Sequence, residues 1–242
     1  MTMSVNTNLS AINAYNNLNS TSNQMNSTVA ELSSGLQIQT AAQDASGYVI
    51  SQGLNVESLG LGQAIQNGQN GVSVLQIAEG AMNQQVSILQ RMNQLATQAA
   101  NSGAMSTSSY TAVQAEFSQL QSQLDQIASS TSFGTTQLLN GNYTGTFQIG
   151  AYSSGTDQVT VTIAGTSTGA MGIAPASVSI GTTATQAQAA MSAVQAAISY
   201  VSSAEAQVAA VQNQIQAVIS NDTISQQKSI FSKMSSAASR AF

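Results

Sequence analysis

The stretch from Ala64 to Ala100 reads AIQNGQNGVSVLQIAEGAMNQQVSILQRMNQLATQAA, and the rest of the chain repeats its pattern. Apolar residues recur along it in steps of three, four or seven, which places them on one face of an α-helix. They are Val72, Leu75, Met82, Val86, Leu89, Met92, Ala96 and Ala99. At ~1.5 Å per residue this helix is about 55 Å long. An apolar stripe of that length needs partner helices of similar length.

Two other stretches carry stripes of the same kind. The longer one extends from Gln186 to Val218, and the shorter one from Val113 to Ile127. Both repeat apolar residues in a heptad-like rhythm, which is typical of helices that pack side by side. We therefore predict a mainly α protein: an elongated antiparallel helical bundle, coiled-coil-like, with a small β-hairpin region. The predicted bundle core contains Leu75, Met82, Leu89, Phe117, Leu120, Leu124, Val194, Ile198, Val201, Val208, Val211 and Ile215.

Capping residues indicate where helices begin and end. A thinner apolar stripe predicts a first helix from Val5 to Leu32, and Gly35 suits its end because glycine readily adopts the left-handed conformation. Asp44 suits the start of the long helix, because an acidic residue is favourable near a helix N-terminus. The run Ser106–Ser109 offers N-caps for the helix that follows.

Six glycines interrupt the long helix, although each costs about 1 kcal/mol relative to alanine in a helix interior. They are Gly53, Gly60, Gly62, Gly68, Gly71 and Gly80. Two explanations stay open. The glycines allow close packing or local kinks within the chain, or they allow close approach of a neighbouring subunit.

Alternation replaces the helical rhythm in the middle of the chain. Apolar residues on alternate positions flank the turn-forming segment Ser153–Asp157 and predict a β-hairpin. They are Phe147, Ile149, Val159, Val161 and Ile163. From Ala164 to Thr185 we expect a loop with a short strand near Val178–Ile180. The triplet Asn221-Asp222-Thr223 is expected to break the last long helix.

The composition excludes several classes of partner. The chain has 242 residues, of which 42% are hydrophobic and only 5% are charged, and its formal net charge is -5. Four basic residues cannot form the dense basic face that nucleic acid requires. No apolar run approaches the ~20 residues of a membrane span, so membrane insertion is not expected.

The residue types also argue against an enzyme. The chain has no cysteine and no histidine, so thiolate or imidazole catalysis and His or Cys metal sites are excluded. Its carboxylates are scattered, and each is more simply a helix cap or a surface charge than half of a catalytic pair. They include Asp44, Glu57, Glu79, Glu116, Asp125 and Asp222. We therefore expect no catalytic activity, no cofactor and no metal.

Short blocks spread over nearly the whole chain carry a family resemblance. They include Leu32-Ser33-Ser34-Gly35-Leu36, Asp44-Ala45-Ser46-Gly47, Ala78-Glu79-Gly80-Ala81, Ile88-Leu89-Gln90-Arg91-Met92, Leu138-Leu139-Asn140-Gly141 and Phe147-Gln148-Ile149-Gly150-Ala151. In this number and order they resemble the bacterial flagellins. The resemblance implies a structural subunit of the flagellar filament, which self-assembles into a helical tube for motility. It also implies a secreted, extracellular protein of the bacterial flagellum that leaves the cell by type III export.

The resemblance implies a division of the chain. Residues 1–42 correspond to an N-terminal inner-tube helix and linker, and residues 43–142 to the long helices of the core bundle. Residues 143–185 form the β-hairpin and a short variable region, and residues 186–221 the C-terminal bundle helix. Residues 222–242 correspond to a truncated C-terminal inner-tube segment. The chain looks like a minimal flagellin without large variable outer domains, and the usual C-terminal inner-tube helix is expected to be absent or shortened.

Partners are implied in the same way. They are further copies of the chain in a homopolymer, the flagellar export apparatus, the cap and junction proteins, an export chaperone, and the innate receptor Toll-like receptor 5. The positions that match the family's receptor contact are Arg91, Leu95 and Glu116. The alternative interpretation of Arg91 is a solvated surface residue or the partner of a nearby acid.

Two other functions stay open. The chain could be a hook-filament junction protein, or a secreted, non-polymerising adhesive or receptor-binding protein. The low charge supports one further hypothesis. Carboxylates protonate near pH ~4 and leave basic groups to repel one another, so a lattice with few charges of either sign keeps its contacts in acid. The alternative is an uncharged polar coat that serves solubility or glycosylation.

Overall fold

A computed structural model describes residues 8–35, 37–101, 103 and 105–238. The chain divides into two compact units. The central unit is Leu61–Thr223, and the terminal unit is formed from the residues before Leu61 and after Thr223. Two long helices, α2 (Ala45–Ala100) and α4 (Ala184–Ala238), contribute to both units. The predicted mainly α fold with a small β region is confirmed.

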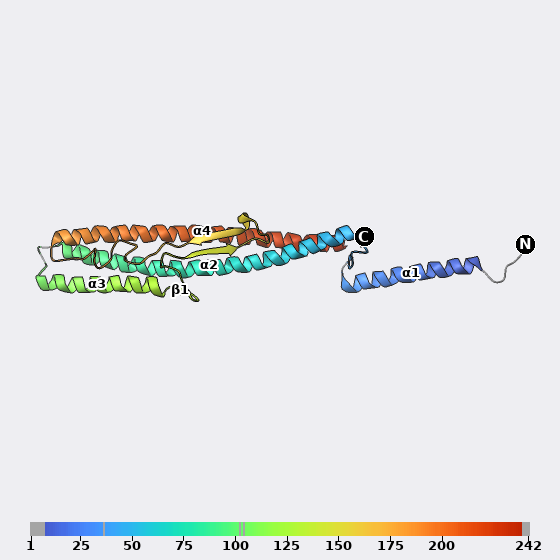
Figure 1. Cartoon of the computed structure of the whole chain (residues 1–242), viewed down its shortest axis with the longest axis horizontal. Helices are drawn as coiled ribbons and strands as arrows, with labels where there is room; N and C mark the ends of the chain where they lie inside the picture. The colour runs from blue at the N-terminus through green and yellow to red at the C-terminus, as the bar shows by residue number, and fades with distance from the viewer. Residues whose placement is uncertain (1–7, 36, 102, 104, 239–242) are drawn as a thin grey trace, which may run out of the picture. The chain divides into compact units, whose positions relative to one another are not determined.

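Three helices form the bundle of the central unit. Helix α3 (Thr107–Ser130) and helix α4 run alongside α2 in the opposite direction (Figure 1). Ser106, the first of the predicted capping residues, caps α3, because its hydroxyl accepts a hydrogen bond of 3.2 Å from the Ser109 backbone N–H. Apolar residues from all three helices meet in one hydrophobic cluster.

The predicted core residues lie in this cluster at two depths. Those that are buried are Leu75, Met82, Leu89, Phe117, Leu124, Val194, Val201, Val208 and Ile215. Leu120, Ile198 and Val211 are half-buried and pack against the same cluster. Burying one large aliphatic or aromatic side chain contributes ~1.5–3 kcal/mol, so this seam is the main source of stability in the central unit.

Two antiparallel strand pairs lie in the central unit. Strands β3 (Thr144–Gln148) and β4 (Gln158–Thr162) form the predicted hairpin, with Phe147 opposite Val159 and a short 3-10 helix, η1 (Gly155–Asp157), before β4. A second pair, β1 (Ser132–Phe133) and β2 (Thr136–Gln137), follows α3 and was not predicted. Each of its strands has two residues, which is too short to show an alternating pattern.

The glycines of α2 have different surroundings. Gly71 lies under the Phe147 ring, because a Cβ added at this glycine would lie 3.2 Å from ring atoms. Gly68 lies against Ile219 of α4. Gly53 and Gly80 have no other heavy atom within 4 Å of such a Cβ. Close packing within the chain therefore explains Gly68 and Gly71, and it does not explain Gly53 or Gly80.

The segment between β4 and α4 is irregular, and the short strand predicted near Val178–Ile180 is wrong. The Gln121 amide of α3 donates to the carbonyls of Ile173 and Val178 at 2.8 and 3.0 Å. The Gln114 amide oxygen accepts from the Ile180 backbone N–H at 2.7 Å. Backbone groups that a strand would pair with a neighbouring strand are thus bonded to side chains of a helix.

The predicted break at Asn221-Asp222-Thr223 is also wrong, because α4 is continuous through this triplet. Residues of these types cost at most about 0.7 kcal/mol each in a helix. The Thr223 hydroxyl donates to the Ile219 carbonyl at 2.7 Å, so it is satisfied inside the helix. Packing of α4 outweighs the weak local preference.

Helix α1 (Leu9–Ser34) begins and ends at capping residues. The Asn8 side chain accepts from the Ala11 backbone N–H at 3.2 Å, and Gly35 adopts the predicted left-handed conformation with φ 67°. Asp44 accepts from the Gly47 backbone N–H at 3.0 Å, as expected at the start of α2. The beginning of the predicted first helix, including Val5, lies outside the described residues.

Candidate functional site

The terminal unit exposes apolar side chains on three helical segments. Helix α1 has no buried residue, although its sequence carries an apolar stripe. The exposed side chains of this stripe are Leu9, Ile12, Tyr15, Leu18, Met25, Val29 and Leu32. Leu18, Met25, Val29 and Leu32 follow one another at spacings of seven, four and three, which places them on one face of the helix.

The first turns of α2 and the last described turns of α4 repeat this arrangement. Val49 and Val56 are exposed and lie seven residues apart, on one face of α2. Ile224 and Phe231 are exposed and lie seven residues apart on α4, where the Phe231 side chain is 73% exposed. A seven-residue spacing keeps side chains on the same face of a helix, as in the seam of a coiled coil.

Polar groups join α2 to α4 within the terminal unit. Gln226 and Ser229 of α4 donate hydrogen bonds of 3.0 Å to the carbonyls of Ser58 and Leu54. The Lys233 ammonium donates to the Asn55 amide oxygen at 2.8 Å.

The residues that make these three bonds are spaced three and four apart along α4, so they lie on one face. Ile224 and Phe231 lie on the opposite face, since one turn of an α-helix takes 3.6 residues. The terminal unit thus has polar bonds where its two long helices meet, and it exposes apolar side chains on other faces. Apolar patches of this kind on a soluble protein mark interaction surfaces.

The structure places the predicted receptor-contact residues in two environments. Arg91 of α2 and Glu116 of α3 form an ion pair, with 2.7 Å between Nη2 and Oε1, and both side chains are about half exposed. Arg91 Nε also donates to Glu116 Oε1 at 2.8 Å. Leu95 is only 1% exposed and belongs to the bundle core. A partner that binds this surface would therefore meet Arg91 and Glu116 but not the Leu95 side chain.

The scattered carboxylates have individual roles. The Asp125 carboxylate accepts two hydrogen bonds of 2.8 Å from the backbone N–H and the hydroxyl of Thr168. Burial raises the pKa of the Asp222 carboxyl, and the nearby charge of Asp157 raises this pKa further. Among the residues described by the structure, no three His, Cys, Asp or Glu side chains are grouped so that they could hold a metal ion.

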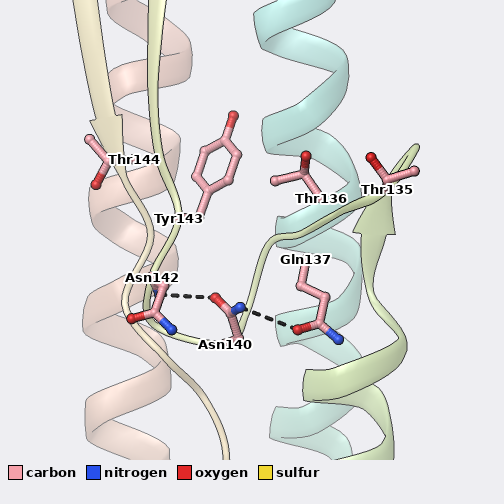
Figure 2. Close-up of a pocket in the computed structure, with 7 residues that line it drawn as sticks. All are labelled: Thr135, Thr136, Gln137, Asn140, Asn142, Tyr143 and Thr144. Carbon is pink, nitrogen blue, oxygen red and sulfur yellow. Dashed lines mark hydrogen bonds between the residues drawn. The ribbon is translucent and has the colours of Figure 1, made fainter.

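A polar pocket of about 470 Å³ lies beside the loop that joins β2 to β3 (Figure 2). It is lined by Thr135, Thr136, Gln137, Asn140, Asn142, Tyr143 and Thr144. These residues offer hydroxyl and amide groups, and burial raises the pKa of the Tyr143 phenol. The lining contains no carboxylate or amine that could act with a hydroxyl as an acid–base pair.

Within the described ranges, no helix is both long and apolar enough to cross a membrane.

Comparison with known proteins finds a family model and relatives that each match about three fifths of the chain. Residues 5–144 match the model of the bacterial flagellin N-terminal helical region. Flagellin D of Vibrio anguillarum is 47% identical over 152 residues, which is 62% of this chain and 40% of that protein. Polar flagellin A of Vibrio parahaemolyticus is 46% identical over 154 residues, or 63% of this chain and 41% of that protein.

The fold has a solved counterpart. The crystal structure of Bacillus cereus flagellin superposes with a TM-score of 0.56 and 22% sequence identity, covering 65% of this chain and 88% of that one. At this identity the likeness describes the fold alone. The chain spans about two fifths of the length of the curated relatives that it matches.

Proposed function

Because this chain belongs to the bacterial flagellin family, we propose that it is a structural subunit of the flagellar filament, polymerising outside the cell for motility. The family is structural rather than enzymatic, and its members form filaments by binding copies of themselves. The sequence-based expectation of a self-assembling filament protein therefore has the support of both the family and the fold.

One observation carries the proposal for how the subunit assembles. In the terminal unit the contact between α2 and α4 is polar, whereas Val49, Val56, Ile224 and Phe231 are exposed. Helix α1 exposes its own apolar stripe. We propose that these faces bury one another between subunits, as an inner tube of helices. Each large side chain buried in this way would contribute ~1.5–3 kcal/mol, so a few per subunit suffice for a stable polymer.

A matched pair of variants on α2 tests this assignment. Val56 lies in the terminal unit and Ile77 in the central unit, and both are exposed. We expect Val56→Asn to suppress polymerisation, measured by sedimentation and electron microscopy, and Ile77→Asn to leave filaments intact. Circular dichroism should show the same helix content in both variants. If both variants polymerised equally well, or lost polymerisation equally, the proposed role of the exposed apolar faces of the terminal unit would be contradicted.

The same micrographs separate the alternatives. Micrometre-long tubes support a filament subunit. Short rings or caps of defined size would support the hook-filament junction protein. Monomers that persist at high concentration would support a secreted adhesive or receptor-binding protein. We also propose export by the flagellar type III apparatus, with cap and junction proteins and an export chaperone as partners. Only membership of the family supports this part of the proposal.

Recognition by Toll-like receptor 5 is a separate proposal. It is supported by the half-exposed pair of Arg91 and Glu116, which offers a charged contact on helices that carry few other charges. Charged side chains at a protein interface favour association with a partner of complementary charge. Arg is also enriched among the interface residues that contribute most of the binding free energy. Receptor signalling by Arg91→Ala monomers, compared with the unchanged chain, tests this proposal. Undiminished signalling would contradict it.

A further inference from the structure

Three asparagines are followed directly by glycine, at Asn67, Asn70 and Asn140. In an Asn–Gly peptide the glycine backbone nitrogen can attack the carbonyl carbon of the asparagine side chain, because glycine has no side chain to obstruct the approach. The reaction also needs a glycine N–H that can lose its proton and a backbone that can bend into a five-membered ring. Local structure therefore decides which of the three pairs reacts.

Two of these pairs lie inside α2. The N–H groups of Gly68 and Gly71 are in the helix interior, where each donates to the carbonyl four residues before it. Both glycines are also buried, Gly68 against Ile219 and Gly71 against Phe147. Attack by either nitrogen requires the middle of the longest helix to open first, which is among the rarest local motions of a packed bundle.

The third pair has none of these protections. Asn140 (Figure 2) and Gly141 are exposed and lie in the loop that joins β2 to β3. Gly141 adopts a left-handed conformation with φ 88°, and in the described part of the chain its N–H has no hydrogen-bond acceptor. No backbone hydrogen bond of the Gly141 N–H therefore has to break before this nitrogen can attack.

Two hydrogen bonds fix the Asn140 side-chain amide. The Asn142 backbone N–H donates to Asn140 Oδ1 at 2.9 Å, and Asn140 Nδ2 donates to Gln137 Oε1 at 3.2 Å (Figure 2). A hydrogen bond to the carbonyl oxygen withdraws electron density from the carbonyl carbon, so it favours attack on this carbon. The same bond stabilises the negative charge that develops on the oxygen when the nitrogen attacks.

We propose that Asn140 is a site of spontaneous deamidation in the folded protein, whereas Asn67 and Asn70 are protected. The Gly141 nitrogen loses its proton to water and forms a bond with Asn140 Cγ. The bond from Cγ to Nδ2 breaks, and ammonia leaves with a proton from solvent. Water then opens the resulting succinimide at either carbonyl, which leaves an aspartyl or an isoaspartyl residue at position 140.

The products change the loop in two ways. The new carboxylate cannot donate to Gln137 Oε1, so this hydrogen bond is lost. The isoaspartyl product adds a methylene to the main chain beside Gly141, where the backbone is tightly packed: a Cβ at Gly165 would lie 2.9 Å from Gly141 Cα. Deamidation therefore loosens the junction between β2 and β3.

The test compares the three sites within one molecule. The full chain is incubated at mildly alkaline pH, digested, and mapped by tandem mass spectrometry, with protein isoaspartyl methyltransferase as the probe for isoaspartate. We expect Asn140 to deamidate more than about tenfold faster than Asn67 and Asn70 in the folded chain. In concentrated urea the three rates should converge, since glycine follows each asparagine. Asn140→Gln should remove the dominant product without changing helix content.

Two results would overturn the proposal. One is a folded-state rate at Asn140 no higher than the rates at the helical sites. The other is a rate at Asn140 that rises more than about tenfold on unfolding, which would show that the loop protects the residue.

Discussion

Gly68 of α2 and Ile219 of α4 meet so closely that a Cβ added at the glycine would lie 2.8 Å from Ile219 Cγ1 and 3.0 Å from its Cδ1. Real Cβ atoms do not approach other carbons at such distances, so a substitution here forces the helices or the side chain to move. The isoleucine has little freedom to yield, because its β-branched side chain favours one rotamer in a helix. This contact sets the distance between α2 and α4 near the end of the central unit.

The first prediction follows from this contact. Gly68→Ala should lower the free energy of unfolding by ~1–3 kcal/mol, because overpacking outweighs the gain in helix propensity. Gly80→Ala should raise this free energy by ~0.5–1 kcal/mol, because Gly80 has open space around it and alanine is the better helix former. Urea denaturation followed by circular dichroism measures both. The prediction fails if the two variants shift the midpoint in the same direction.

The second prediction concerns the buried amide that holds the irregular segment before α4. Gln121 is fully buried and donates to the carbonyls of Ile173 and Val178. Gln121→Met keeps the volume but leaves two carbonyls without their donors, and each such group costs ~1–3 kcal/mol when it stays buried. We expect lower stability and faster hydrogen exchange from residue 173 to residue 180. Gln123→Met, on the exposed face of α3, should change neither.

Much of this fold could be predicted because one pattern recurs along the chain. The stripes in α2, α3 and α4 and the capping residues Gly35, Asp44 and Ser106 indicated the helices and several of their ends. The segment held by Gln121 has no periodicity, and two of its carbonyls, those of Ile173 and Val178, are bonded by a side chain on another element. Sequence could not reveal this arrangement, nor the continuity of α4 through Asp222, where tertiary packing outweighs weak local preferences.

The exposed apolar faces of the terminal unit, which are proposed to join subunits, could be predicted only in part. The stripe of α1 resembles the stripe of α2, yet Leu18 is 67% exposed while Leu89 is fully buried. Periodicity identifies the apolar face of a helix, but it does not show whether the same chain or another copy covers that face. Likewise, the family resemblance groups Arg91, Leu95 and Glu116 as candidates, and only the packing separates the buried leucine from the half-exposed ion pair.

The third prediction uses the raised pKa of Asp222. A carboxyl whose pKa is higher in the folded state binds protons more tightly there, so folding gains stability as the pH falls from neutral through this raised pKa. The gain is complete below the ordinary Asp pKa of about 3.9. Asp222→Asn should therefore raise the stability at neutral pH and flatten its dependence on pH in this range, as measured by thermal melts.

Asp125→Asn serves as the control for this effect, since it should act in the opposite direction at neutral pH. The Asp125 carboxylate accepts two hydrogen bonds from Thr168, and bonds to a charged group contribute ~1.5–3 kcal/mol each. Replacing this carboxylate by an amide should therefore lower the melting temperature. If both substitutions lowered the stability at neutral pH, the raised pKa assigned to the Asp222 carboxyl would be contradicted.

The fourth prediction is that filaments persist in acid. The chain has nine acidic and four basic residues, and the ion pair of Arg91 with Glu116 is half exposed and worth ~0.2–1 kcal/mol. In the terminal unit, α2 and α4 are joined by hydrogen bonds to neutral partners, and the exposed faces are apolar. Neither interaction weakens when carboxylates protonate, because apolar burial does not depend on charge.

We therefore expect light scattering and electron microscopy to show intact filaments from neutral pH down to about pH 4, where free carboxylates titrate. Filaments of a charge-rich flagellin, measured in parallel, should dissociate over this range, since protonation leaves their basic groups unbalanced. Raising the salt concentration should change the stability of this chain's filaments little, because few charges are there to be screened. If its filaments dissociated in acid as readily as the charge-rich ones, ionic rather than apolar contacts would have to join the subunits, and the assembly face proposed for the terminal unit would be wrong.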